Sequence, residues 1–277
     1  MPYFLLLFWL WLPGGTPAPP TLAPLQIAEQ FVANGSWPAM KSYLCCEAAS
    51  QAKRQSLGQQ IPARMRRTCE LLQQNSVTAV VAVELRDSVE QKDFYLHFSK
   101  DSSGWKLSAI RSLAMTQFAP PMLRILTAMP PDEVAQYNRK HPDASHAFMV
   151  GNMHLWTAAD ADIKAYFNLH RTDFQELVRL VQAGKFLTGT STDNHAGEQA
   201  ANADPIIHRR LQQLFITRVG NSNTGCESCV DFLIAGMVDN TVGLLYAPNP
   251  ASLPAMSPNQ LIVLRPLGEG WYLYKTS

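Results

Sequence analysis

The spacing of apolar residues in the first third of the chain changes once, from the period of a helix to that of a strand. In 25–50 the apolar side chains recur at intervals of three and four residues, and Pro24 stands where the first turn of a helix tolerates proline. A second helix is predicted after Pro38. A third is predicted over 62–74, where a proline opens the segment and three apolar side chains share one face.

Beyond Asn75 apolar and polar residues alternate, which is the pattern of half-buried strands. Residues 77–85 are rich in valine, and 94–99 place aromatic and aliphatic side chains on one face. After a Ser-Ser-Gly turn, 105–110 alternate again. Because a short turn joins neighbouring antiparallel strands, this part of the chain is predicted to be a meander of strands.

The rest of the chain shows the same order of helices before strands. A short helix is predicted over 131–140 and a long one over 162–182, where an apolar stripe follows helical spacing and Gly184 ends it. Asp204 and Pro205 open a further helix, since a cap residue followed by proline is typical of a helix start. Two pairs of strands follow, each around a short turn: 230–238 with 241–247, and 261–265 with 271–275.

Two proline pairs divide the chain. The pairs at 120–121 and 130–131 interrupt any regular element, because proline lacks the N–H donor and restricts the residue before it. We therefore expect an α+β protein of two domains, each with helices followed by an antiparallel β-meander. The predicted parts are a leader with its linker, a first domain, a connector and a second domain: 1–24, 25–113, 114–131 and 132–277.

The helix-then-meander order over 25–113 ends in a strand that starts at Gly104 with the residues Gly-Trp-Lys-Leu. In this order the segment resembles the NTF2-like (cystatin-like) family of α+β cone folds. The resemblance implies a curved sheet wrapped around a helix, in a family that includes enzymes, binding modules and dimerisation modules. The last strand, Trp-Tyr-Leu-Tyr from Trp271, resembles the closing strand of bacterial α+β proteins to which we attach no activity.

The composition argues against several classes of function. Of the 277 residues, 47% are hydrophobic and 16% are charged, and the formal net charge is +1. A nucleic-acid-binding protein usually carries a basic excess, and a multi-span membrane protein needs stretches of about 20 apolar residues, which this sequence lacks. Glycine loops that hold phosphates, the Gly-x-Ser-x-Gly elbow and the His-Glu-x-x-His motif are also missing. We expect no cofactor, no metal ion and no nucleic acid.

A short apolar run, 3–12, precedes a stretch rich in proline and glycine, 13–24. As a helix, its ten residues would span about 15 Å, roughly half of a bilayer core. This length is typical of the apolar region of a signal peptide, although no basic residue precedes the run. We expect an exported bacterial protein, periplasmic or envelope-associated. Cleavage of 1–24, its retention as an anchor and a misassigned start codon are all left open.

Five cysteines are compatible with disulfides in an exported chain, with at least one thiol left over. A bond from Cys45 or Cys46 to Cys69 would close a loop of about 25 residues, worth roughly 3 kcal/mol in chain entropy. We take Cys46 with Cys69 as a possible disulfide.

Cys226 and Cys229 form a Cys-x-x-Cys motif with three interpretations. A redox dithiol needs a helix N-terminus to lower the pKa of a thiol, whereas this motif leads into a predicted strand. A zinc site needs further ligands, and His195 and His208 are the candidates. A disulfide that staples a turn, or a pair of inert thiols, is the favoured interpretation.

Two histidines are weak candidates for catalysis. His97 is the candidate for a cone-lining residue, although the alternation places it on the face opposite Phe94. His170 lies on the apolar stripe of 162–182, where a histidine is more often a core residue with satisfied nitrogens. Asp160 and Asp162 precede the same helix, and we interpret them as caps and dipole partners rather than metal ligands.

The favoured function is a non-catalytic module of the cell envelope that binds a small ligand or a partner protein. Clefts between domains are common binding sites. The candidate ligand-binding residues are therefore those predicted to face the cone or the cleft between domains: Phe94, Leu96, Phe98, Trp105 and Tyr166.

Two alternative functions are open. An enzyme would use a cone-lining histidine or the pair Cys226 and Cys229. A structural protein of envelope assembly would use a basic helix face, which can contact an anionic membrane surface or an acidic partner. The basic cluster consists of Lys53, Arg54, Arg64, Arg66 and Arg67, and Arg64 and Arg67 would share one side of the helix predicted over 62–74. The oligomeric state has no signal in the sequence.

Overall fold

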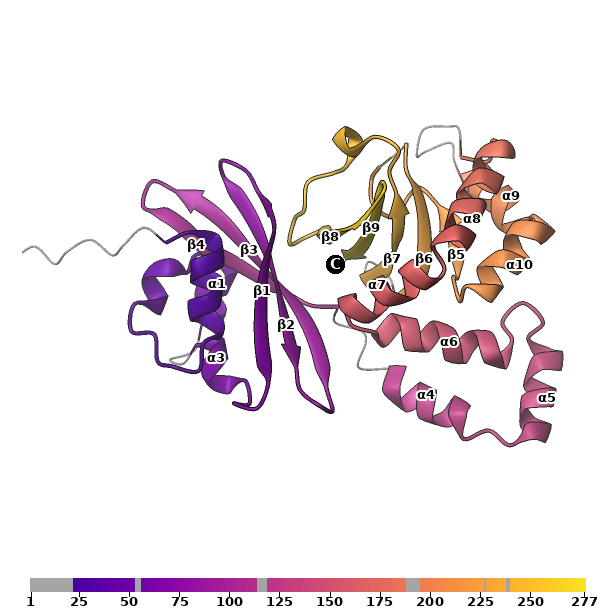
Figure 1. The fold of residues 1–277 in the computed structure, drawn as a ribbon, viewed down its shortest axis with the longest axis horizontal. Coiled ribbons are helices and arrows are strands. Elements are labelled where there is room, and N and C mark those ends of the chain that lie inside the picture. Colours follow the sequence, from indigo (N-terminus) through magenta and orange to yellow (C-terminus); the bar gives the residue numbers. More distant parts are fainter. Residues whose placement is uncertain (1–21, 53–55, 114–118, 188–194, 227, 238–239) are drawn as a thin grey trace, which may run out of the picture.

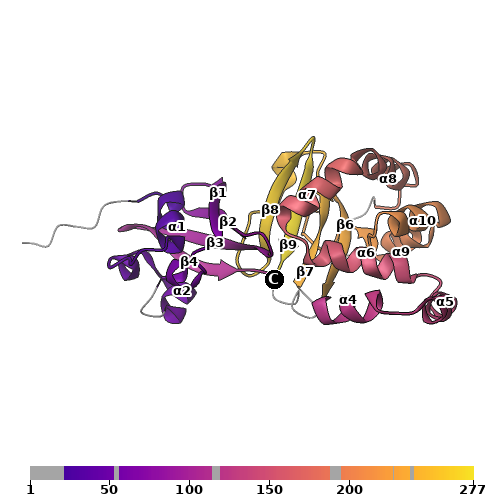
Figure 2. The same cartoon turned by 60° about the horizontal axis from the view of Figure 1, so that its bottom comes forward.

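The computed structural model describes residues 22–52, 56–113, 119–187, 195–226, 228–237 and 240–277. They form an α+β structure with two antiparallel sheets, one in each half of the chain. Along the long axis of the molecule the order is helices, first sheet, second sheet and helices again (Figures 1 and 2). We refer to residues 22–113 as the N-terminal half and to residues 119–277 as the C-terminal half.

The N-terminal half consists of a helical layer and a four-stranded meander. Its helices are α1 (Pro24–Val32), α2 (Cys46–Gln51) and α3 (Leu57–Gln60). Its strands, in their order across the sheet, are β1 (Arg66–Gln74), β2 (Thr78–Arg86), β3 (Gln91–Asp101) and β4 (Gly104–Arg111). All neighbouring strands are antiparallel, as the alternating pattern predicts.

The central strands β2 and β3 are buried on both faces, whereas one face of an antiparallel sheet commonly contacts water. One face packs on α1 and contributes Val81, Val83 and Leu96 to the core of the N-terminal half. The other face carries Val80 and Ala82, which pack against the C-terminal half. Because successive side chains of a strand point to opposite faces, each strand serves both the core and the junction.

The prediction of a helix over 62–74 is wrong, because the structure has a strand in this segment. Residues 66–74 form β1, which pairs with β2 along its whole length and packs against α1. Three apolar residues at helical spacing also fit a strand, and pairing with a neighbouring strand decides between the two. The helix side that Arg64 and Arg67 were expected to share is therefore not formed.

The C-terminal half packs helices against a five-stranded sheet. Its helices are α4 (Ala119–Thr127), α5 (Pro131–Lys140), α6 (His146–Thr157), α7 (Asp160–Leu169), α8 (Arg171–Ala183), α9 (His195–Ala203) and α10 (Pro205–Gln213). Its strands, in their order across the sheet, are β5 (Arg218–Gly220), β6 (Val230–Met237), β7 (Asn240–Tyr246), β9 (Trp271–Thr276) and β8 (Leu261–Gly268). Among the described residues, no helix is long and apolar enough to cross a membrane.

An aromatic cluster lies at the centre of this half. Phe167 on α7 and Phe174 on α8 contact Trp271 on β9, with ring centroids 5.1 and 5.9 Å apart. The apolar stripe predicted over 162–182 supplies both phenylalanines. A break at His170 divides the stripe into two helices, which lets both pack on the same sheet.

Several predicted helix boundaries are confirmed and other elements were not predicted. The helix over 131–140 is α5, and Asp204 caps α10 by accepting the N–H groups of Ile206 and Ile207. The sequence analysis did not predict α4, α6, α9 or the short strand β5. The helix α4 lies within the expected connector and has Pro120 and Pro121 in its first turn, where a helix tolerates proline. The buried face of α6 includes the polar Asn152, and the apolar residues Met149 and Val150 are only partly buried, so its helical period is hard to recognise in the sequence. Residues 114–118 of the expected connector and most of 1–24 lie outside the described residues.

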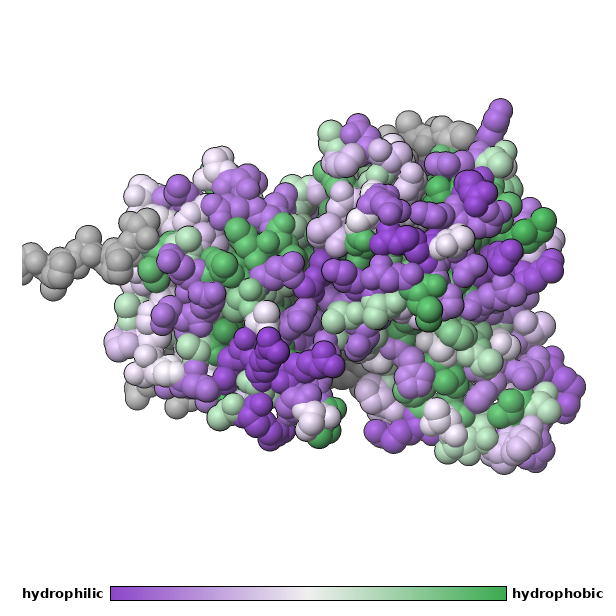
Figure 3. Space-filling model, in the orientation of Figure 1, coloured by the Kyte–Doolittle hydropathy of each residue, from purple (hydrophilic) through white to green (hydrophobic). Residues whose placement is uncertain are grey.

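The two halves meet where the outer face of the first sheet packs on β8. Tyr95, Val80 and Ala82 form an apolar cluster with Ile262 and Val263. In the space-filling view, hydrophilic residues are prominent along the boundary between the halves (Figure 3). The junction thus has an apolar centre and a polar surround.

Beside this apolar cluster lies a fully buried carboxylate, Asp160, with 0% of its surface exposed. Tyr95 donates its hydroxyl to both carboxylate oxygens, at 2.8 and 2.9 Å. Lys275 donates to Oδ1 at 2.7 Å and Arg265 to Oδ2 at 3.0 Å. Although burial alone would raise it, the two cations hold the pKa of Asp160 below its usual value.

Asp160 and Asp162 were expected to act as caps and dipole partners, and both lie in the first turn of α7, where a carboxylate is favourable to the helix dipole. The N-cap of α7 is Ala159, and neither Asp160 nor Asp162 takes that position. Arg265 extends the buried cluster further, because it also pairs with Glu84 at 2.9 Å and with Glu70. One ion cluster thus joins α7, β8 and β9 of the C-terminal half to β1, β2 and β3 of the N-terminal half.

Replacing Asp160 by alanine is expected to lower the free energy of unfolding by about 3–5 kcal/mol, because Lys275 and Arg265 lose their buried partner. The matched control is Asp162→Ala in the same helical turn, where the side chain is exposed and about 1 kcal/mol or less is expected. Urea unfolding followed by circular dichroism measures both values. Small effects of equal size would contradict this role of Asp160.

Candidate ligand-binding site

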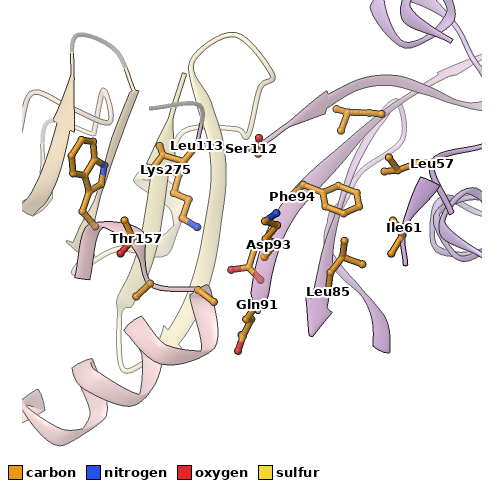
Figure 4. A pocket seen from close by; sticks show the side chains of 15 residues that line it. Leu57, Ile61, Leu85, Gln91, Asp93, Phe94, Ser112, Leu113, Thr157 and Lys275 are labelled. Carbon is orange, nitrogen blue, oxygen red and sulfur yellow. The ribbon is translucent and has the colours of Figure 1, made fainter. Parts of the chain in front are cut away.

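A cavity of about 490 Å³ lies between the two halves, directly beside the Asp160 cluster. Its volume falls within the range of roughly 300–1,000 Å³ that is usual for small-molecule sites. Figure 4 shows that Leu57, Ile61, Leu85 and Phe94 gather on the side of the N-terminal half. The other apolar lining residues come from the end of β4 and the segment after it, from the last turn of α6, and from the turn between α6 and α7: Ile110, Leu113, Trp156, Ala158 and Ala159.

The charged residues of the cavity lining are Lys92, Asp93 and Lys275. Lys92 pairs with Glu90 at 2.5 Å. Asp93 and Lys275 approach the cavity from opposite halves, and their charged groups point toward each other (Figure 4). Asp93 Oδ2 accepts the backbone N–H of Asp160 at 2.6 Å. Its other oxygen, Oδ1, is buried and has no hydrogen-bond partner within the part of the chain that the structure describes.

The environment of Asp93 raises the pKa of its carboxyl group to about 6. Burial is the main cause, and the neighbouring Asp160 carboxylate adds to it, while Lys275 acts in the opposite direction. Such a group changes its charge close to neutral pH. It can therefore accept hydrogen bonds from a ligand when ionised, or exchange a proton with one.

Of the five residues predicted to bind a ligand, only Phe94 lines the cavity. Leu96, Phe98 and Trp105 are buried in the core of the N-terminal half, because α1 fills the inner face of the sheet. Tyr166 lies on α7 and its ring contacts that of His170, with centroids 4.5 Å apart. The concave face is thus a packed core, and the cavity lies at the edge of the sheet.

The two histidine candidates lie outside the cavity. His97 is 3% exposed and hydrogen-bonds the backbone of Ile262, on the face of the sheet opposite Phe94. Burial is the main reason why the pKa of His97 falls to about 4, so the ring is neutral at physiological pH. His170 stands between α7 and α8 with Nδ1 3.4 Å from Asp173. Neither imidazole reaches the cavity described above.

Cys226 and Cys229 form a disulfide at the entrance to β6, and both side chains are buried. The disulfide packs on Leu245 and Tyr274, away from the cavity. No group of three metal-binding side chains occurs among the described residues, so the motif has no zinc partners there.

The expected pairing of Cys46 with Cys69 is not formed. Both are free thiols, because Cys69 belongs to β1 while Cys46 starts α2. The nearest sulfur to Cys46 is that of Cys45, at 2.9 Å. Burial raises the pKa of the Cys69 thiol to about 11, and burial also raises the pKa of Cys45.

Two of the basic residues near β1 are engaged within the N-terminal half, and a third, Arg66, is exposed. Arg64 pairs with Asp87 at 2.8 Å, and Arg67 donates to the carbonyl oxygens of Gly58 and Ile61 at the end of α3. Lys53 and Arg54 lie outside the described residues. The structure therefore does not bring the whole predicted basic cluster together.

A second hollow of about 500 Å³ lies in the C-terminal half. Hydroxyl and amide side chains dominate its lining, among them Asn223, Thr241, Asn259 and Thr276. Thr241 and Thr276 already bond to each other at 2.6 Å. The cavity at the junction is the stronger candidate because its wall is largely apolar and its lining includes Asp93, one oxygen of which has no hydrogen-bond partner among the described residues.

Sequence reasoning missed Asp93 and Lys275. Both carried a weak signal, since each is a charged residue next to a buried aromatic side chain in a strand. No family model, curated protein or solved structure matches the chain. The candidate site therefore rests on the geometry of the cavity.

Asp93→Asn is expected to raise the free energy of unfolding by roughly 1–3 kcal/mol at pH 7.5 and to have little effect at pH 4. The folded-state pKa of about 6 lies above the unfolded value of 3.8, so the ionised carboxylate costs stability as the pH rises through that window. The asparagine oxygen can still accept the Asp160 N–H. Urea unfolding at both pH values gives the difference, and a variant less stable than wild type at pH 7.5 would refute this reading.

Alkylation of the native protein with iodoacetamide is expected to modify the exposed Cys46 first and Cys69 last. Cys69 is half-buried and has the raised pKa, so its modification should require unfolding. Peptide mass mapping over time reports the order. Equal rates of alkylation at Cys46 and Cys69, or a disulfide-linked peptide that contains both, would contradict the arrangement of free thiols described here.

Proposed function

We propose that this protein is a non-catalytic ligand-binding module, in which a small molecule with an apolar body occupies the cavity between the two halves. The observation that carries the proposal is the cavity itself. Its wall is apolar along Leu85 and Phe94, and one buried carboxyl oxygen of Asp93 has no partner among the described residues. Apolar sites with a few placed polar groups are typical of small-molecule binding.

We further propose that the halves are two domains, the first of them NTF2-like, and that the protein is exported to the bacterial cell envelope. The packing of α1 on a four-stranded antiparallel meander supports the first part. The apolar run at 3–12 and the disulfide between Cys226 and Cys229 support export, since disulfides persist in oxidising compartments.

An enzyme is the second candidate, and one observation favours it. The pKa of Asp93 near 6 suits a general acid or base, and the Lys275 ammonium lies across the same cavity. A catalytic role needs at least a second polar group that contacts the reacting atoms. Lys275 is already bound to Asp160 at 2.7 Å, which favours binding over catalysis.

A neutral apolar dye such as N-phenyl-1-naphthylamine is expected to bind at a single saturable site, with an increase in its fluorescence. Ser112→Phe should block binding, because Ser112 is an exposed residue of the cavity lining and the ring would project into its mouth. Ser102→Phe, in the exposed turn between β3 and β4, is the matched control.

The decisive comparison is between these two variants. Binding that is lost in Ser112→Phe and kept in Ser102→Phe supports the proposal. Binding that is absent from the wild type, or unaffected by Ser112→Phe, would refute it. A ligand that bound and was converted would instead favour the enzyme.

A further inference from the structure

Two adjacent cysteines at the start of α2 bring their sulfur atoms together. The Sγ atoms of Cys45 and Cys46 are 2.9 Å apart, both residues are free thiols, and Cys46 is exposed. Side chains of adjacent residues normally diverge, in a helix as well as in a strand. The contact between these two sulfurs therefore needs a local cause. Neither cysteine belongs to the lining of the cavity at the junction.

The cause is a change of backbone conformation between the two residues. Cys45 is extended, with φ of −143° and ψ of 177°. Cys46 has a φ of 54°, in the left-handed region that residues other than glycine adopt uncommonly. The change brings both side chains to the same side of the chain, as the contact between their sulfurs shows. Such backbone angles persist where the surroundings hold them, and they are frequent at functional sites.

The surroundings hold Cys45 from three sides. Its N–H donates to the carbonyl oxygen of Leu107 on β4 at 2.9 Å, and its own carbonyl oxygen accepts the N–H of Ala49 in α2 at 3.0 Å. Its sulfur lies 3.4 Å from Ser99 Oγ on β3. One sulfur of the pair is thus fixed, and the other can approach it by rotation of the exposed Cys46 side chain.

We propose that Cys45 and Cys46 are a reversible redox site, in which a small disulfide such as oxidised glutathione converts the two thiols into a disulfide between adjacent residues. The Cys46 thiolate attacks first, because it is exposed and because burial raises the pKa of the Cys45 thiol. This step forms a mixed disulfide and releases one thiol of the oxidant. Cys45 then attacks the sulfur of Cys46 and displaces the second thiol. The protein loses two protons and two electrons, which the oxidant gains.

The resulting bond is expected to open easily. Across a trans peptide the Cα atoms of adjacent residues are about 3.8 Å apart, whereas roughly 4.4–6.8 Å is usual for a disulfide. The bond is therefore strained, and strained or exposed disulfides are the ones that small thiols reduce. Cys226 and Cys229, by contrast, are buried with their Cα atoms 5.4 Å apart. The free thiols of Cys45 and Cys46 are the reduced state of the proposed site.

The test exposes the reduced full-length protein to oxidised glutathione, blocks the remaining thiols with N-ethylmaleimide and maps tryptic peptides by mass. The peptide 42–53 carries both cysteines. It should lose the mass of two hydrogen atoms and carry neither glutathione nor N-ethylmaleimide. Reduced glutathione added afterwards should restore both thiols while the bond between Cys226 and Cys229 stays intact.

Two variants identify the sulfurs that react. Cys69→Ala is the matched control and should form the same bond, because the third free thiol takes no part in it. Cys45→Ser should instead keep glutathione on Cys46, because the thiol that displaces it is missing. Both results together support the proposal.

Other outcomes would overturn it. The redox site is refuted if peptide 42–53 keeps two reactive thiols at every concentration of oxidised glutathione. It is also refuted if this peptide becomes linked to the one that contains Cys69, or if glutathione remains on Cys46 of the wild-type protein. A bond between Cys226 and Cys229 that is reduced before the bond between Cys45 and Cys46 would refute its reversibility.

Discussion

The carboxylate of Asp160 is the constraint on which the arrangement of the two halves depends. A charge with no exposed surface must be paired, and its partners Tyr95, Lys275 and Arg265 come from both sheets. Satisfying one residue of α7 therefore fixes the positions of β3, β8 and β9 relative to each other. The neighbouring apolar cluster also stabilises the junction by burying apolar surface. Because the hydrophobic effect is non-directional, it does not by itself select the relative position of the two sheets.

The same arrangement creates the candidate site. Asp93 belongs to the lining of a cavity between the two halves, and the backbone N–H of Asp160 donates to one of its carboxylate oxygens. The other oxygen is buried and has no hydrogen-bond partner among the described residues. The cluster thus stabilises the junction through Asp160. It also buries Asp93 in an environment where the ionised carboxylate lowers the stability of the folded protein. Residues whose ionised form is unfavourable in the folded protein are typical of functional sites, where stability and function are opposed.

Most helices and strands could be predicted from the sequence, whereas the residues that they contact in the folded protein could not. Alternation identified β2, β3 and β4, and the cap at Asp204 identified α10, because these signals are local. The strand β1 was missed because pairing with β2 decides its structure. Asp160 was interpreted as a cap and His97 as outward-facing, since no pattern in one sequence reveals that a second sheet covers the outer face of the first. Asp93 was missed for the same reason.

The central claim is that the Asp160 cluster joins the two halves into one cooperative unit with the cavity between them. Hydrogen exchange in increasing urea tests it most directly, with peptides from β2 and β3 compared with peptides from β8 and β9. In the wild-type protein both sets should lose protection at the same urea concentration, and in Asp160→Asn the two transitions should separate. Separate transitions in the wild type, or a single unchanged transition in Asp160→Asn, would contradict the account.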